Sequence, residues 1–129
     1  VLEIDCRHVV LTGGEPLLQP DVVPLTAAVR EAGRHVTVET AGTVYRPVAA
    51  DLISISPKLS NSTPSDGHRE GGGRYAARHD RLRDNHEAVR RLTGEYDYQV
   101  KFVVDRADDL AEIDEYLARY GHLDRGKVF

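Results

Sequence analysis

The chain has 129 residues, a length that suits one domain better than two. Its 17 lysines and arginines against 21 aspartates and glutamates give a net charge of −4, which argues against binding to a nucleic-acid backbone. No apolar run approaches the roughly 20 residues of a membrane span. A single cysteine, Cys6, cannot form an internal disulfide, so we expect a reducing, cytoplasmic setting.

The first half of the chain alternates between expected strands and a helix. Residues 7–12 are rich in β-branched side chains and precede two glycines, which predicts a short buried strand. A helix is expected from Pro20 to Gly33, because its apolar residues recur at helical spacing and glycine commonly follows a helix end. Two further strands are expected at residues 35–39 and 51–56.

The composition changes between Pro57 and His79, where Ser, Asn, Gly, Pro and Arg dominate. This predicts a long loop, of which residues 65–78 are expected to be mobile without ligand. Its first part, residues 59–64, carries unusually many short hydroxyl and amide groups for a solvent loop. Beyond it we expect a helix at 80–92, a strand at 98–104 and a helix at 108–120. Val128-Phe129 reads as the start of another strand, and the chain lacks methionine, so we expect a piece of a longer protein.

This order of elements predicts an α/β fold with a parallel sheet and crossover helices. Two architectures fit: a doubly wound sheet, and an arc of a β/α barrel. Both place ligands at the C-terminal ends of the strands. The unusual residues of the sequence gather at those ends.

Two glycines directly follow the first expected strand. Gly13 and Gly14 permit positive φ and let a ligand come close to the backbone. Glu15 adds a carboxylate beside bare carbonyls. Such a corner suits an ammonium group, whereas Glu15 would repel a phosphate. A plain tight turn before a helix is the alternative.

Two other strand ends offer polar groups. Ser56 and Lys58 flank a proline and suit a carboxylate or ribose hydroxyls. Gln99 and Lys101 alternate with apolar residues in the last strand, so they share a face. Because a buried lysine is costly unless paired, we expect both to face the same cavity as Ser56. The alternatives are a strand-end turn with a solvated Lys58 and a sheet-edge Lys101 in water.

The remaining acidic residues allow more than one interpretation. Glu39 ends the second expected strand and could accept hydrogen bonds from hydroxyls or a base edge, and a cap by Thr40 fits equally well. Aspartates at 105, 108 and 109 surround a helix start, where they favour the positive end of the helix dipole. The histidines are scattered, so no histidine metal site is expected.

At these positions the sequence resembles a known family. Residues 9–18 (VVLTGGEPLL) are similar to the Gly-Gly-Glu-Pro segment of radical S-adenosylmethionine (SAM) enzymes. The segments 38–43 (VETAGT), 54–62 (SISPKLSNS) and 99–104 (QVKFVV) narrow the resemblance to 7-carboxy-7-deazaguanine synthase. They span nearly the whole chain, in the family's order.

The resemblance implies a partial (β/α) barrel of the radical SAM type, with residues 1–129 as the central to C-terminal part of a single core domain, incomplete at both ends. It implies a carbon–nitrogen lyase that converts 6-carboxy-5,6,7,8-tetrahydropterin to 7-carboxy-7-deazaguanine with loss of ammonia, in queuosine and deazapurine biosynthesis. The implied cofactors are SAM, a reduced 4Fe–4S cluster and Mg²⁺. The implied partners are the pterin, an electron donor such as flavodoxin and a second copy in a homodimer, without nucleic acid or membrane.

The resemblance also implies roles for single residues. Thr12 would contact the pterin, and Gly14, with Glu15 beside it, would receive the ammonium of SAM. The other positions that would line the SAM site are Ser56, Pro57, Lys58, Gln99, Val100, Lys101 and Phe102.

The chain departs from the family at its cluster motif. The three cysteines of the family's Cys-x3-Cys-x2-Cys motif, the magnesium-binding threonine and the substrate-closing tail are absent, and Cys6 is not a cluster ligand. We therefore expect the cluster and Mg²⁺ ligands outside this chain, which alone would be inactive. The alternatives are another radical SAM enzyme, such as an activase-type hydrogen abstractor, and a non-catalytic truncated remnant.

Overall fold

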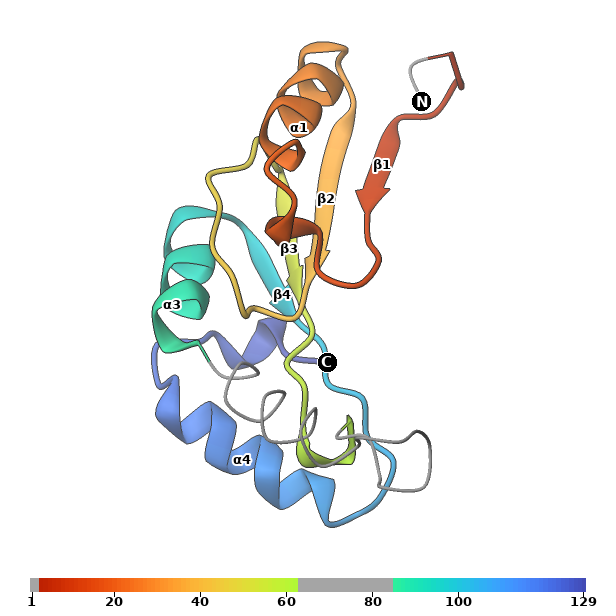
Figure 1. Ribbon diagram of the computed structural model, residues 1–129. Coiled ribbons are helices and arrows are strands. Elements are labelled where there is room, and N and C mark those ends of the chain that lie inside the picture. Colours follow the sequence, from red (N-terminus) through yellow and green to blue (C-terminus); the bar gives the residue numbers. More distant parts are fainter. Residues whose placement is uncertain (1–2, 63–84) are drawn as a thin grey trace, which may run out of the picture.

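The computed structural model describes residues 3–62 and 85–129, which contain one parallel sheet in the order β1-β2-β3-β4 (Figure 1). Neighbours in the sheet are also neighbours in the chain, as the expected alternation of strands and helices requires. The strands are β1 (His8–Leu11), β2 (His35–Thr40), β3 (Leu52–Ile55) and β4 (Tyr98–Val100).

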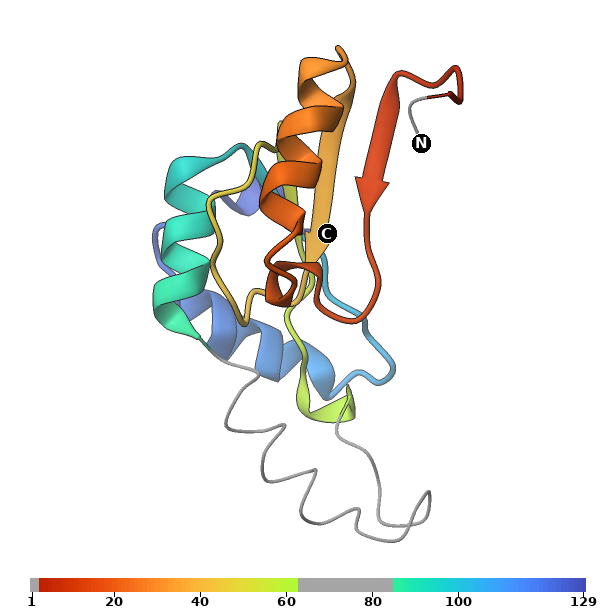
Figure 2. The same ribbon diagram turned by 45° about the horizontal axis from the view of Figure 1, so that its top comes forward.

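The described α-helices pack against one face of this sheet, as both views show (Figures 1 and 2). α1 (Val22–Glu31) ends just before Gly33, whose φ of 75° confirms it as the residue that terminates the helix. α3 (His86–Glu95) begins at Asn85, whose side chain accepts a hydrogen bond from the backbone N–H of Ala88. α4 (Asp109–Arg119) follows β4.

Side-chain alternation along β2 explains which face the helices cover. Val36 and Val38 are fully buried and pack with residues of α1 and α3. Glu39 points to the opposite face, where its register partners are Ser54 on β3 and, through Ser54, Gln99 on β4. A parallel sheet with helices on one face and a polar row on the other fits the partial barrel, since a doubly wound sheet has helices on both faces.

Three of the four strands are shorter than the sequence pattern predicts, most of all β4, whereas β2 is one residue longer than expected. A strand was expected over 98–104, yet β4 ends at Val100. Val103 is 66% exposed, because the chain leaves the sheet there to reach α4. The expected start of a further strand is confirmed: Val128 forms a parallel bridge to Val100.

Two predictions fall on residues 63–84, outside the described part of the chain. They are the mobile loop at 65–78 and the first turn of the helix expected at 80–92. Among the described residues, no helix combines the length and the apolar character needed to cross a bilayer.

Candidate functional site

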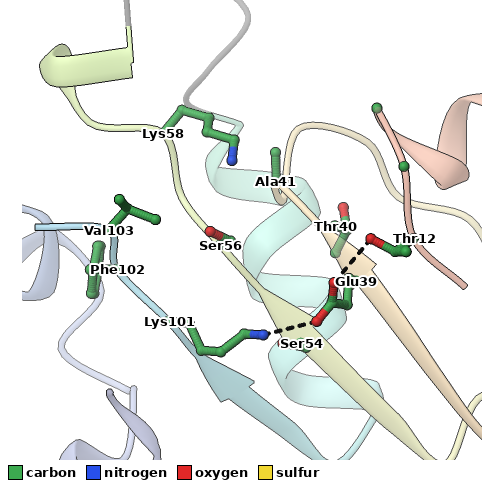
Figure 3. A pocket seen from close by; sticks show the side chains of 12 residues that line it. Thr12, Glu39, Thr40, Ala41, Ser54, Ser56, Lys58, Lys101, Phe102 and Val103 are labelled. Atoms are coloured by element: carbon green, nitrogen blue, oxygen red, sulfur yellow. Dashed lines mark hydrogen bonds and ion pairs between the residues drawn. The ribbon is translucent and has the colours of Figure 1, made fainter. Parts of the chain in front are cut away.

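A cavity of about 490 Å³ lies at the C-terminal ends of the strands (Figure 3). This is the edge at which parallel α/β proteins bind their ligands, and the volume falls in the usual range for small-molecule sites. β2 and β3 contribute to its lining, and so do the segments that directly follow β1, β3 and β4. The lining residues are Thr12–Gly14, Glu39–Ala41, Ser54, Ser56, Lys58 and Lys101–Val103.

A polar trio crosses this cavity. The Glu39 carboxylate accepts hydrogen bonds from Lys101 Nζ and Thr12 Oγ1, each at 2.9 Å, which reach it from opposite sides (Figure 3). The bond from Lys101, and then the one from Thr12, holds the pKa of Glu39 below its ordinary value. Lys101 is therefore ion-paired at the cavity, and its predicted place beside Ser56 is confirmed.

Gln99 lies one row below the cavity. Its Nε2 donates a hydrogen bond to Ser54 Oγ at 3.0 Å, and Ser54, only 1% exposed, lines the cavity. The expectation that Gln99 also faces the cavity is therefore wrong: Gln99 does not line it, because its side chain is bonded to Ser54 one residue pair below Lys101. Val100 points the other way, into the core beneath the helices, and Pro57 is buried between the two lining residues Ser56 and Lys58.

The two glycines after β1 present bare backbone to the cavity. Gly13 and Gly14 have φ values of 106° and 42°, a conformation that side-chain-bearing residues rarely adopt. A Cβ at either position would meet no heavy atom within 4 Å. The space above them is therefore open, as a ligand that contacts backbone atoms requires.

The structure places Glu15 differently from the expectation that it lies beside the ligand. Its side chain does not line the cavity, and its carboxylate accepts from Thr40 Oγ1 at 2.8 Å and from Ala41 N–H at 3.0 Å. It also accepts from Leu17 N–H, at the start of a single 3-10 turn. Glu15 therefore joins the segment after β1 to the end of β2 and the turn that follows it. Its carboxylate takes part in these hydrogen bonds and does not face the cavity.

Sequence reasoning missed a second set of hydrogen bonds, which joins the segment after β3 to α4. Asn61 and Asp109 are hydrogen-bonded to each other, and Ser60 is bonded to Glu112. The many hydroxyl and amide groups in residues 59–64 were the available signal. The expectation for the aspartates near 108 was incomplete: Asp108 makes no capping hydrogen bond, and Asp109 binds loop residues.

The polar groups of the lining suit an amino-acid ligand and do not suit a metal cluster. Lysine ammonium groups and hydroxyls match a carboxylate, and the open space at the backbone of the two glycines leaves room for an ammonium group. The sequence holds one cysteine, so this chain cannot supply the thiolates of a 4Fe–4S cluster. In the part of the chain that the structure describes, no group of three or more His, Cys, Asp or Glu side chains could hold a metal ion.

Comparison with known proteins confirms the predicted resemblance, although no family model matches the chain. It is 48% identical over 112 residues to the 7-carboxy-7-deazaguanine synthase of Halobacterium salinarum, covering 86% of this chain and 44% of that protein. It is 48% identical over 110 residues to the Rhodopirellula baltica synthase, with 84% and 42% covered. Identity to the Pyrobaculum aerophilum synthase is 33% over 129 residues, with 95% and 48% covered.

The fold agrees with this resemblance. The crystal structure of QueE from Escherichia coli matches with a TM-score of 0.57 and 30% identity, over 89% of this chain and 41% of that one. The chain thus spans less than half the length of the relatives it matches. The predicted α/β fold of parallel strands and crossover helices is confirmed.

Proposed function

We propose that this chain is the central to C-terminal part of a 7-carboxy-7-deazaguanine synthase, and that the cavity at its strand ends binds SAM. One observation carries the proposal: Gly13-Gly14, Ser56, Lys58 and Lys101, which belong to separate segments of the resemblance, line a single cavity. Sequence segments that are far apart meet where the fold places ligands.

The chemistry of each wall supports SAM as the occupant. The open space at the backbone of Gly13 and Gly14 suits the methionine ammonium, which needs backbone acceptors and no side-chain bulk. The Ser56 hydroxyl and the Lys58 ammonium suit the methionine carboxylate. The Glu15 side chain serves the turn after β2, so the backbone is proposed to receive the ammonium.

Thr12 is proposed to contact the pterin. Its hydroxyl already donates to Glu39 at the rim of the cavity, where both side chains are accessible. A substrate that offers donors to Glu39 would release the Thr12 hydroxyl for its own hydrogen bond. Thr12 and Glu39 would then act as a polar pair that orients the substrate against SAM.

The activity of the whole protein is proposed from its relatives. SAM supplies the group that removes hydrogen from the substrate in radical SAM enzymes, and the residues of this chain bind and orient it. The 4Fe–4S cluster and Mg²⁺ require ligands outside this chain. We propose further that the whole protein is a carbon–nitrogen lyase of the cytoplasm. A donor such as flavodoxin would reduce its cluster, and two copies would form a homodimer.

The test is an assay of the full-length protein that contains this chain. With SAM, reductant and 6-carboxy-tetrahydropterin, the expected product is 7-carboxy-7-deazaguanine with one equivalent of ammonia. Formation of 5′-deoxyadenosine without deazaguanine would contradict the specific reaction and point to another hydrogen-abstracting enzyme. The absence of both products would contradict an active enzyme.

A further inference from the structure

We infer that Asn61 and Asp109 form a positioning pair for the cavity, which fixes the distance between the wall after β3 and the wall after β4. The inference rests on the proposed function, because it assigns the pair an effect on SAM affinity. Neither side chain lines the cavity, so the pair acts through the residues that do.

The side-chain amide of Asn61 bridges the two walls of the cavity. Its Nδ2 donates to Asp109 Oδ2 at 2.8 Å and to the backbone oxygen of Val103 at 3.1 Å. Asn61 lies on the segment that continues from Lys58, and Val103 lines the cavity on the opposite wall. One amide group therefore joins the two walls directly.

The Asp109 carboxylate accepts hydrogen bonds from both sides of the cavity. Asp109 is 7% exposed, and its Oδ2 also accepts from the backbone N–H groups of Asp105 at 2.8 Å and Arg106 at 3.0 Å. These bonds, first those from Asp105 and Arg106 and then that from Asn61, lower the pKa of Asp109. The charged carboxylate thus gathers the loop after β4 and the segment after β3 at one oxygen atom.

The sheet itself no longer holds the walls together at this point. β3 ends at Ile55, and the backbone bond from Lys101 N–H to the Ile55 oxygen, at 2.8 Å, lies at the end of the ladder. Beyond it, no backbone hydrogen bond among the described residues joins 56–62 to 102–106. Side chains must therefore set the separation of the walls, and Asn61 and Asp109 do so.

A neighbouring contact holds the segment after β3 against α4. Ser60 donates from its backbone N–H at 3.0 Å and from its hydroxyl at 2.6 Å to the Glu112 carboxylate. This contact holds the segment to α4 but does not reach Val103. Among the described residues 59–62, Asn61 alone hydrogen-bonds a residue of the opposite cavity wall, Val103, and Asp109 holds Asn61 in that position.

The test measures SAM affinity by titration calorimetry, together with melting temperature, on the full-length protein with its cluster in place. Asn61→Ala is expected to weaken SAM binding roughly 10-fold or more, because a small misplacement of binding groups is costly. Asp109→Ala should act similarly, and the double variant should lose no more than the worse single variant, because both remove one coupled unit. Asp109→Asn keeps an acceptor oxygen and should recover part of the affinity.

Thr26→Val provides the matched control. Thr26 is fully buried in α1 and accepts a hydrogen bond from Ala49 N–H at 3.1 Å, away from the cavity walls. It should lower the melting temperature without changing SAM affinity. Asn61→Ala with wild-type affinity, or Thr26→Val with an equal affinity loss, would overturn the inference alone. Absence of SAM binding by the wild type would overturn the proposed function as well.

Discussion

Lys101 and Glu39 form an ion pair with 2.9 Å between Nζ and Oε1. Glu39 lies in β2 and Lys101 directly follows β4, so the pair spans the intervening strand β3. The pair crosses above Ser54 and ties the end of β4 to the end of β2. It pairs the charge of Lys101 at the cavity. Within the described residues Lys58 forms no ion pair, which leaves its charge available for an anionic group of the ligand.

The Lys101–Glu39 pair predicts a pH dependence of stability. Lys101 and Thr12 lower the pKa of Glu39 in the folded protein, so the unfolded chain takes up the proton first as pH falls. The contribution is therefore full above the unfolded pKa of about 4.3 and is lost as pH falls through the lower folded pKa. Both side chains are about 40% exposed (42% and 38%), so we expect at most about 1 kcal/mol.

Urea unfolding of the full-length protein measures this contribution. Glu39→Gln should lower the midpoint at neutral pH, and its difference from the wild type should shrink as pH falls below the usual glutamate pKa of about 4.3. Asp21→Asn is the control, because the Asp21 side chain makes no capping hydrogen bond. A gap between Glu39→Gln and wild type that stays constant with pH would contradict the assigned role of the pair.

Gly14→Val tests the open backbone after β1. Valine at a φ of 42° is strained by roughly 1–2 kcal/mol, and its side chain would stand in the cavity. We expect SAM binding to be abolished while the protein stays folded. Gly33→Val is the matched control, since Gly33 has a φ of 75°, open space around its Cβ and a position away from the cavity. Equal affinity losses in the two variants, measured by calorimetry, would show that strain and not the cavity is responsible.

The hydrogen bond from Thr40 to Glu15 is predicted to stabilise the folded protein. Glu15→Gln leaves one buried donor poorly paired, so we expect a loss of about 1–3 kcal/mol in the free energy of unfolding. Thr40→Val should be coupled to it by roughly 0.5–3 kcal/mol in a double-mutant cycle. Additive stability effects, combined with a large loss of SAM affinity in Glu15→Gln, would contradict this structural role and indicate that Glu15 binds the ligand.

The parallel sheet and the cavity edge were predictable from the sequence because their signals are local. The alternation in β2 places Val38 in the core and Glu39 on the open face, and the glycines after β1 precede open space. The sequence pattern therefore predicted the strands, the faces of β2 and the edge at which the binding residues meet. The expectation that the first strand is buried was wrong, because β1 lies at the edge of the sheet and Val10 is exposed.

Contacts between distant residues were not predictable in this way. Glu15 meets Thr40 25 residues later, and Asn61 meets Asp109 48 residues later, so neither pair leaves a local pattern. Val103 looked like part of a strand, because an apolar run does not reveal that the chain leaves the sheet after Val100.

The most direct test of the central claim is a crystal structure of the full-length protein with SAM bound. We expect the methionine ammonium within hydrogen-bond distance of the backbone at Gly13-Gly14, and the carboxylate beside Ser56 and Lys58. SAM bound away from the ends of β1 and β3, with this cavity filled by solvent, would contradict it.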